Sequence, residues 1–315
     1  MNNTLHKDKL IAIIGPTGVG KSRLAVELAF HFNGEIIGAD SRQVYRYMNI
    51  GTAKPNQEDM AKVPHHLINI AEPEDDFNLA AYHTLFERTI EGVCTAGRLP
   101  FIVGGSGLYI WSVLENWDIP VVAPDRQYRQ QLEERVTQFG GEELYDELKG
   151  IDPQSAVQID SRNVRRVIRA LEVNRQTGQT FSSLRRKREE QYDYLIIGLT
   201  TEREYLYKLI DRRVDQMMEA GLIEEVKSLL NTGYSFNAPA LSGIGYQQIC
   251  SYIKGELGLE AAIQQIKYET HRFVRQQYNW FKKNDERIHW YDVRYNDVLD
   301  KTSELIDSFI EKRQA

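Results

Sequence analysis

The stretch GPTGVGKS, residues 15–22, constrains this chain more than any other feature, because it has the G-x-x-x-x-G-K-[ST] spacing of a phosphate-binding loop. LIAIIG (10–15) before it is typical of a buried strand, and RLAVELAFHF (23–32) after it of an amphipathic helix. In such a loop, backbone N–H groups surround a polyanion at the positive end of the helix, with the lysine on the terminal phosphates and the hydroxyl on Mg²⁺. A diphosphate or nucleotide is therefore expected on Gly15, Pro16, Thr17, Gly18, Val19, Gly20, Lys21 and Ser22.

Further apolar runs alternate with helical segments along the chain. EIIGAD (35–40) ends in an acid, LPFIVGGSGLYI (99–110) ends in a glycine-rich turn, and YLIIGLT (194–200) is a later core strand. This alternation predicts an α/β fold, a P-loop NTPase-like parallel sheet with helices on both faces. Ligands in such sheets lie at the carboxyl ends of the strands, where these turns fall.

Between residues 117 and 193 the pattern is helical and polar, with the clearest helices at 125–140 and 161–178. This segment lies between two strands of the α/β pattern. We therefore predict an inserted all-helical domain at 117–193, and a catalytic core made of residues 1–116 and 194–315.

Charge is segregated in this chain, whose net charge is −6. Residues 161–188 hold nine basic side chains and one acid, Glu172, so this segment carries +8 and the remainder −14. Such clustering is typical of a surface that meets a nucleic-acid backbone, although a solvated helical face has the same appearance. The basic residues are Arg162, Arg165, Arg166, Arg169, Arg175, Arg185, Arg186, Lys187 and Arg188.

Composition excludes several classes of protein. Two cysteines, Cys94 and Cys250, cannot form a disulfide framework or a cysteine-rich zinc site. The adjacent His65 and His66 cannot both face one metal from a strand. The sequence has no apolar run that approaches the ~18 residues of a membrane span. We expect a cytoplasmic protein with reduced thiols.

The segment DSRQVYR (40–46) follows the second predicted strand. Asp40 there has two interpretations: it could hold a metal, as the strand-end acid of a kinase or NTPase does, or it could accept a proton as a general base. Ser41 and Gln43 can hydrogen-bond a purine edge, and Arg42 can contact a phosphate. Spacing alone leaves both roles of Asp40 open.

Seven motifs in one order give a specific resemblance. Together with the final helix, they resemble the tRNA dimethylallyltransferase family, also called tRNA isopentenyltransferases, from Leu10 to about Lys283. With its two distant cysteines, the chain is similar to bacterial members that lack a C-terminal zinc finger. The motifs are GPTGVGKS, DSRQVYR, NIGTAKP (49–55), HHLINI (65–70), GGSGLY (104–109), RRVIRALEV (165–173) and SGIGYQQ (242–248).

The resemblance implies a prenyl transfer. Dimethylallyl diphosphate would give its five-carbon group to the exocyclic amine of the adenine just 3′ of the anticodon, position 37 of the tRNA, and release diphosphate. Asp40 would be the base, while Lys21, Mg²⁺ and Arg213, with Arg212 as the alternative, would stabilise the leaving group. Ser106 would complete the catalytic site where the family commonly has threonine. A monomer is expected.

The resemblance also implies contacts with the tRNA anticodon stem-loop. The residues that match are Asp40, Ser41, Arg42, Gln43, Ser106, Arg129, Arg165, Arg166, Arg169, Gly243, Ile244, Gly245 and Tyr246. THRFVRQQ (270–277) departs from the family pattern, because His271 and Gln276 replace arginines. Three other functions stay open: an adenylate isopentenyltransferase acting on free AMP, a P-loop kinase or ATPase that binds ATP, and a non-catalytic RNA-binding protein.

Overall fold

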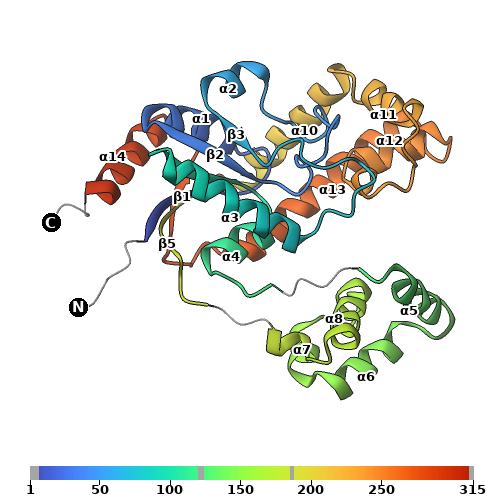
Figure 1. Cartoon of the computed structure of the whole chain (residues 1–315). Helices are drawn as coiled ribbons and strands as arrows, with labels where there is room; N and C mark the ends of the chain where they lie inside the picture. The colour runs from blue at the N-terminus through green and yellow to red at the C-terminus, as the bar shows by residue number, and fades with distance from the viewer. Residues whose placement is uncertain (1–6, 120–123, 185–187, 312–315) are drawn as a thin grey trace, which may run out of the picture. The chain divides into compact units, whose positions relative to one another are not determined.

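The computed structural model describes residues 7–119, 124–184 and 188–311. The chain divides into two compact units, residues 115–190 and the remainder. The insertion expected at 117–193 therefore corresponds to a unit that begins two residues earlier and ends three residues earlier. Each unit has its own hydrophobic core. Figure 1 labels the helices and strands of both units.

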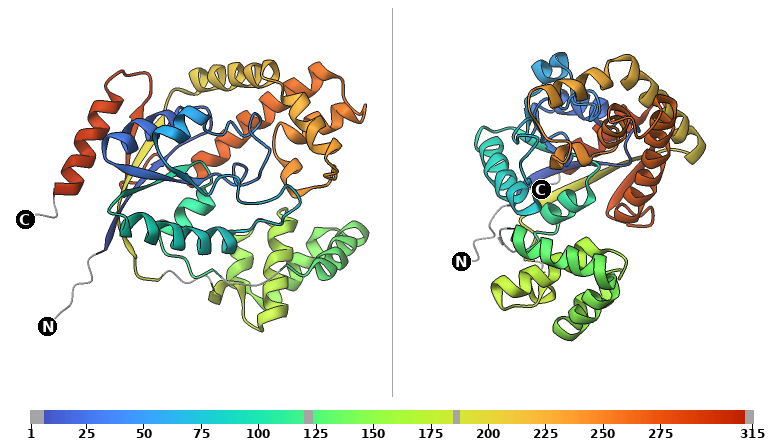
Figure 2. Two further views of the ribbon diagram at one scale, coloured as in Figure 1. Left: turned by 45° about the horizontal axis from the view of Figure 1, so that its top comes forward. Right: turned by 90° about the vertical axis from the view of Figure 1, so that its right-hand side faces the viewer.

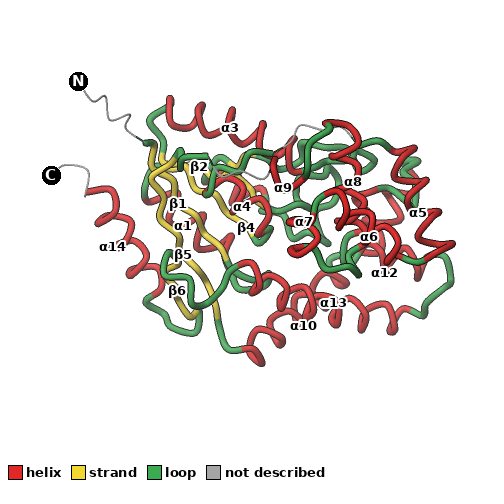
Figure 3. Tube along the Cα trace, turned by 90° about the horizontal axis from the view of Figure 1, so that it is seen from below, coloured by secondary structure: helices red, strands yellow, loops and turns green. Residues whose placement is uncertain are grey.

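The larger unit is built on a parallel sheet whose six strands have the order β3-β2-β4-β1-β5-β6. Figure 3 shows the strands side by side. Leu10 to Ile14 are fully buried in β1, because helices cover both faces of a parallel sheet. The strands are β1 (Asp8–Ile14), β2 (Gly34–Ala39), β3 (His65–His66), β4 (Leu99–Gly104), β5 (Tyr192–Thr200) and β6 (Ile288–Asp292).

Helices cover the two faces of this sheet. On one face α1 (Lys21–His31) and α14 (Val298–Glu311) pack through Leu28 and Ile306 onto Ile11, Ile13 and their neighbours. On the other face lie α3 (Leu79–Thr95) and α4 (Gly107–Leu114), where the Tyr82 and Tyr109 rings stack with centroids 3.9 Å apart. The short helix α2 (Gln57–Lys62) precedes β3. The predicted α/β architecture is thus confirmed.

A second helical layer follows β5 in the chain. Its helices are α10 (Arg203–Glu219), α11 (Leu222–Asn231), the 3₁₀ turn η1 (Pro239–Ser242), α12 (Tyr246–Ile253) and α13 (Leu259–Trp280). Figure 2 shows these helices, in yellow to orange, gathered beyond one end of the sheet. Their core includes Val214, Leu222, Tyr246 and Ile266, and it also holds Val44 and Met48 from the segment after β2.

The smaller unit is all helical among its described residues. It contains α5 (Arg126–Phe139), α6 (Gly141–Ile151), α7 (Pro153–Gln158), α8 (Val164–Thr177) and α9 (Phe181–Leu184). Gly178 ends α8 with φ of 67°, as expected for its glycine C-cap, and Asn163 caps the start of α8 by accepting a hydrogen bond from the Arg166 N–H. Leu132, Leu144, Val167 and Leu171 form the core.

Candidate active site

The loop between β1 and α1 has the backbone conformation that its glycines predict. Gly15, Gly18 and Gly20 all have positive φ, between 81° and 142°. A Cβ on Gly15 would lie 2.4 Å from the Leu199 carbonyl oxygen, so this position needs glycine for close packing as well as for its φ. The Lys21 ammonium donates a hydrogen bond to the Pro16 carbonyl, 2.7 Å away, which folds the side chain back over the loop.

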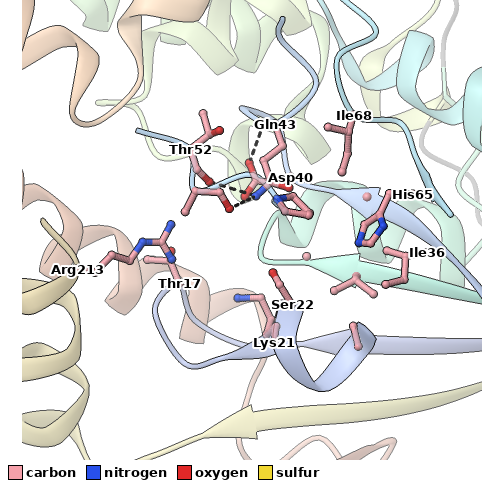
Figure 4. Close-up of a pocket in the computed structure, with 16 residues that line it drawn as sticks. Thr17, Lys21, Ser22, Ile36, Asp40, Gln43, Thr52, His65, Ile68 and Arg213 are labelled. Carbon is pink, nitrogen blue, oxygen red and sulfur yellow. Dashed lines mark hydrogen bonds between the residues drawn. The ribbon is translucent and has the colours of Figure 1, made fainter. Parts of the chain in front are cut away.

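One cavity brings together side chains from three separate segments of the larger unit. Thr17, Lys21 and Ser22 come from the loop and the start of α1, Asp40 comes from the turn directly after β2, and Arg213 comes from α10. Figure 4 shows Asp40 facing Lys21 and Ser22 across the cavity, with Arg213 on a third side. Arg212, the alternative to Arg213, is exposed and does not line the cavity. The turn of α10 thus distinguishes the two arginines.

The two cations of this cavity, Lys21 and Arg213, are half-buried. Burial lowers the pKa of Lys21 to about 7, with Asp40 acting to raise it and Arg213 to lower it further. Burial also lowers the pKa of Arg213, against the opposite influence of Asp40. Two positive groups beside a single carboxylate form a site that favours an added anion.

Asp40 is oriented by the backbone that follows it. Its Oδ1 accepts hydrogen bonds from the N–H groups of Arg42 (2.8 Å) and Gln43 (3.4 Å). Among the described residues no donor hydrogen-bonds to Oδ2, so this oxygen is available to a ligand in the cavity. Ser106, another predicted catalytic residue, accepts a hydrogen bond from the Ser41 N–H (3.0 Å) and so lies beside the same segment.

Two side chains expected to contact RNA are also hydrogen-bonded to neighbouring backbone carbonyls. The Gln43 Nε2 donates to the Thr52 and Ala53 carbonyls, both at 3.1 Å, which leaves its Oε1 as the group that can accept from a base. The Arg42 Nη1 donates to the Pro239 carbonyl at 3.0 Å. Hydrogen bonds from Gln43 therefore join the DSRQVYR and NIGTAKP motifs, which are also neighbours in the sequence.

A carboxylate that the sequence analysis did not single out organises the NIGTAKP loop. Glu225 on α11 accepts hydrogen bonds from the N–H groups of Asn49, Ile50 and Gly51, at 2.8, 2.8 and 3.3 Å. It also accepts from the Tyr246 hydroxyl. Tyr246 is 1% exposed and lies in the core, so RNA contact by the SGIGYQQ motif would fall to Gly243, Ile244 and Gly245.

The glycines of the GGSGLY turn lie against neighbouring segments of the larger unit. A Cβ on Gly104 would lie 2.0 Å from the Ala39 carbonyl oxygen, one on Gly105 would lie 2.2 Å from Gln277 Nε2, and one on Gly107 would lie 2.3 Å from the Trp280 ring. These glycines permit close packing against β2 and α13.

The four arginines of the smaller unit that were predicted to contact tRNA fall into two groups. Arg129 and Arg169 both pair with Glu172, at 2.8 and 2.5 Å, and this carboxylate is 0% exposed. Arg165 and Arg166 are exposed and make no ion pair within the described part of the chain. Arg185, Arg186 and Lys187 lie outside the described residues. The single acid of the basic segment is thus an internal anchor, and Arg165 and Arg166 present the free charge.

The described residues contain no cluster of three or more His, Cys, Asp or Glu side chains that could hold a metal. His65 and His66 make separate contacts, with the Val63 carbonyl (2.7 Å) and with Glu35 (2.7 Å). None of the helices in the described residues is both long and apolar enough to span a membrane.

Comparison with known proteins gives two family matches. The family described as IPP transferase matches residues 43–284, and that described as isopentenyl transferase matches residues 8–72. A tRNA dimethylallyltransferase of Dehalococcoides mccartyi is 47% identical over 281 residues, which cover 89% of this chain and 86% of that protein. One from Halalkalibacterium halodurans is 43% identical over 302 residues, covering 95% and 96%.

Solved structures show the same relationship over almost the whole chain. The tRNA isopentenylpyrophosphate transferase of Bacillus halodurans is 40% identical, with a TM-score of 0.73, and the match covers 98% of both chains. A eukaryotic dimethylallyltransferase described as acting on tRNA is 26% identical, with a TM-score of 0.80, over 97% of this chain and 80% of that one.

Proposed function

Because the chain belongs to the tRNA dimethylallyltransferase family, we propose that it transfers a dimethylallyl group from dimethylallyl diphosphate to tRNA. The acceptor is the exocyclic amine of the adenine just 3′ of the anticodon, and diphosphate is released. The observation that carries this proposal is the cavity in which Lys21, Ser22 and Arg213 lie around the same space as Asp40. A cationic cradle and a carboxylate are the two groups that this reaction requires.

The chemistry follows from that arrangement. The bond between the allylic carbon and the diphosphate oxygen breaks as the bond from that carbon to the adenine nitrogen forms. Lys21 and Arg213 stabilise the negative charge that develops on the departing diphosphate. Two backbone N–H groups hold Asp40 by its Oδ1, and its Oδ2 accepts the proton that leaves the adenine amine. The phosphate-binding loop thus serves a leaving group, and no phosphoryl group is transferred.

Mg²⁺ fits the donor set of this cavity. Magnesium takes oxygen ligands, keeps several waters and is commonly held by substrate phosphates together with one or two protein groups. The Ser22 hydroxyl would hold it, with the diphosphate supplying further oxygens, so a larger protein cage is not required. When bound, the ion would neutralise part of the diphosphate charge.

The tRNA contacts are proposed for both units. Arg165 and Arg166 would contact phosphates of the anticodon stem-loop, while Arg129 and Arg169 would add charge and hold their helices together through Glu172. The target adenine must leave the base stack to reach Asp40, at a cost of a few kcal/mol. We also propose that the protein acts as a monomer in the cytoplasm, where its RNA substrate is found.

One experiment tests the reaction. An unmodified anticodon stem-loop incubated with the protein, Mg²⁺ and dimethylallyl diphosphate should gain the mass of one dimethylallyl group, located on the adenine 3′ of the anticodon. AMP as acceptor distinguishes the adenylate isopentenyltransferase, and ATP with Mg²⁺ alone distinguishes a kinase or ATPase. Absence of a mass gain on RNA, with turnover in either of the other assays, would contradict the proposal.

A further inference from the structure

A buried glutamine connects the two loops that carry the proposed reaction. Gln277, on α13, is 3% exposed, and both ends of its side-chain amide are hydrogen-bonded. Its Oε1 accepts from the Thr17 N–H of the phosphate-binding loop, at 2.9 Å. Its Nε2 donates to the Gly105 carbonyl in the turn after β4, at 3.0 Å. One side chain therefore hydrogen-bonds to two backbone groups that are 260 and 172 residues away in the sequence.

The packing around Gln277 leaves little room for another arrangement. A Cβ on Gly105 would lie 2.2 Å from Gln277 Nε2, so a glycine is needed for the amide to reach the carbonyl. One helical turn further on, Trp280 covers Gly107, and its carbonyl accepts a hydrogen bond from Trp111 Nε1 at 3.0 Å. The end of α13 is thus held against the GGSGLY segment at two successive turns.

The contacts continue from Gly105 to the proposed base. Ser106 follows Gly105 and accepts a hydrogen bond from the Ser41 N–H, and Ser41 follows Asp40. On the other side, Thr17 belongs to the loop that carries Lys21 and lines the same cavity as Asp40. Gln277 does not itself line that cavity, so it acts on the substrates only through the segments that it joins.

We propose that Gln277 is a positioning residue that fixes the distance between the diphosphate-binding loop and the segment bearing Asp40. This inference rests on the proposed function, because it concerns the separation of the prenyl donor from the adenine amine. A displacement of about 1 Å between reacting groups can lower a rate by about 10²-fold. Gln277 hydrogen-bonds to neither Lys21 nor Arg213, so these two residues, which are proposed to bind the diphosphate, should remain in place when Gln277 changes.

Two near-isosteric variants separate positioning from simple loss of structure. Gln277→Met keeps the volume and removes both hydrogen bonds. Gln277→Glu keeps an acceptor for the Thr17 N–H but sets a carboxylate against the Gly105 carbonyl. We expect the single-turnover transfer rate to fall by about 10-fold to 10²-fold in the Met variant and further in the Glu variant. Pyrophosphate affinity, measured by calorimetry, should change by less than about threefold, which also shows that the variants are folded.

The matched control is Gln265→Ala, because Gln265 is an exposed glutamine on the same helix. Its transfer rate should equal that of the unchanged protein. A full transfer rate in Gln277→Met would overturn the positioning role. So would a loss of pyrophosphate affinity as large as the loss of rate, because Gln277 would then act on binding.

A reciprocal pair of substitutions tests the contact itself. Gly105→Ala should lower the transfer rate, since its methyl group occupies the space of the Gln277 amide. In a Gln277→Ala background the methyl group has room, so Gly105→Ala should add no further loss. Independent, multiplying losses would overturn the proposal. If the unchanged protein transfers no prenyl group to RNA, the proposed function fails, whereas an active protein with an active Gln277→Met variant refutes the positioning role alone.

Discussion

The cationic side chains of the two units lie in different surroundings. In the larger unit, Lys21 and Arg213 line a cavity as half-buried side chains beside one carboxylate, and burial lowers both pKa values. In the smaller unit, Arg129 and Arg169 neutralise a buried glutamate, while Arg165 and Arg166 stand in solvent. The first arrangement suits a small, dense anion that enters a cavity, because electrostatic interactions are strong where water is excluded. The second suits an extended polyanion whose charges are screened by salt.

The largest effect is expected at the carboxylate of the larger unit. Asp40→Ala should lower prenyl transfer by about 10²-fold to 10⁴-fold, the usual contribution of a general base, and should leave tRNA affinity nearly unchanged. Single-turnover rates and RNA binding isotherms measure the two quantities. Wild-type turnover in this variant would remove Asp40 as the base.

Substitution of Arg213 should have the next largest effect, because this half-buried cation lines the cavity proposed for the leaving diphosphate. Arg213→Ala should cost about 2.7–4 kcal/mol of barrier, as the loss of one charge-stabilising donor commonly does. Arg212→Ala is the matched control, since Arg212 is its exposed neighbour. Equal losses of kcat in the two variants would show that the cavity does not select between these arginines.

In the smaller unit, the corresponding test concerns the buried acid. Glu172→Gln should lower the free energy of unfolding by about 2 kcal/mol, less than for a fully buried ion pair, because Arg129 and Arg169 are partly exposed. Burial acts to raise the pKa of Glu172, but hydrogen bonds from Arg129 and Arg169 lower it, and the net shift is downward. Its stabilisation should therefore be present at neutral pH and be lost as pH falls through that lowered value. Thermal unfolding with Asp146→Asn, at an exposed acid of the same unit, is the comparison; equal shifts would contradict the anchoring role.

The buried lysine should make diphosphate binding depend on pH. A bound anion raises the pKa of Lys21 from about 7, so binding takes up a proton when pH exceeds that value. Pyrophosphate affinity should then fall by up to about tenfold per pH unit above pH 7. In the Lys21→Arg variant this side chain stays charged over the whole pH range. Its remaining pH dependence therefore measures the titration of pyrophosphate itself. The same pH profile in both proteins would show that Lys21 is already charged before binding.

The smallest effect is expected from a single exposed arginine. Arg165→Ala should weaken tRNA binding modestly and reduce the slope of log affinity against log salt by about one. Arg135→Ala is the control, because Arg135 is already paired with Glu143 and Glu147 in the same unit. An unchanged slope in Arg165→Ala would mean that this side chain touches no phosphate, and the comparison between the units would lose its basis.

The sequence alone was sufficient to predict the architecture and the main side chains of the candidate site. A strand, a glycine-rich loop and a helix in that order predict the phosphate-binding loop, and buried apolar runs predict a parallel sheet, because both signals depend on neighbouring residues. Asp40 was identified for the same reason, since it ends a predicted strand. The basic segment was also visible as a run of residues along one part of the chain.

Tertiary structure alone decided which distant groups meet. The turn of α10 directs Arg213, and not Arg212, toward the cavity. Packing buries Glu172 beside two arginines. It also brings Glu225 into hydrogen-bonding distance of the NIGTAKP loop. Gln277 reaches Thr17 and Gly105 in the same way. Side-chain periodicity shows which residues share a face of one helix, but it does not show what that face contacts. Those contacts arise when segments far apart in the chain pack together.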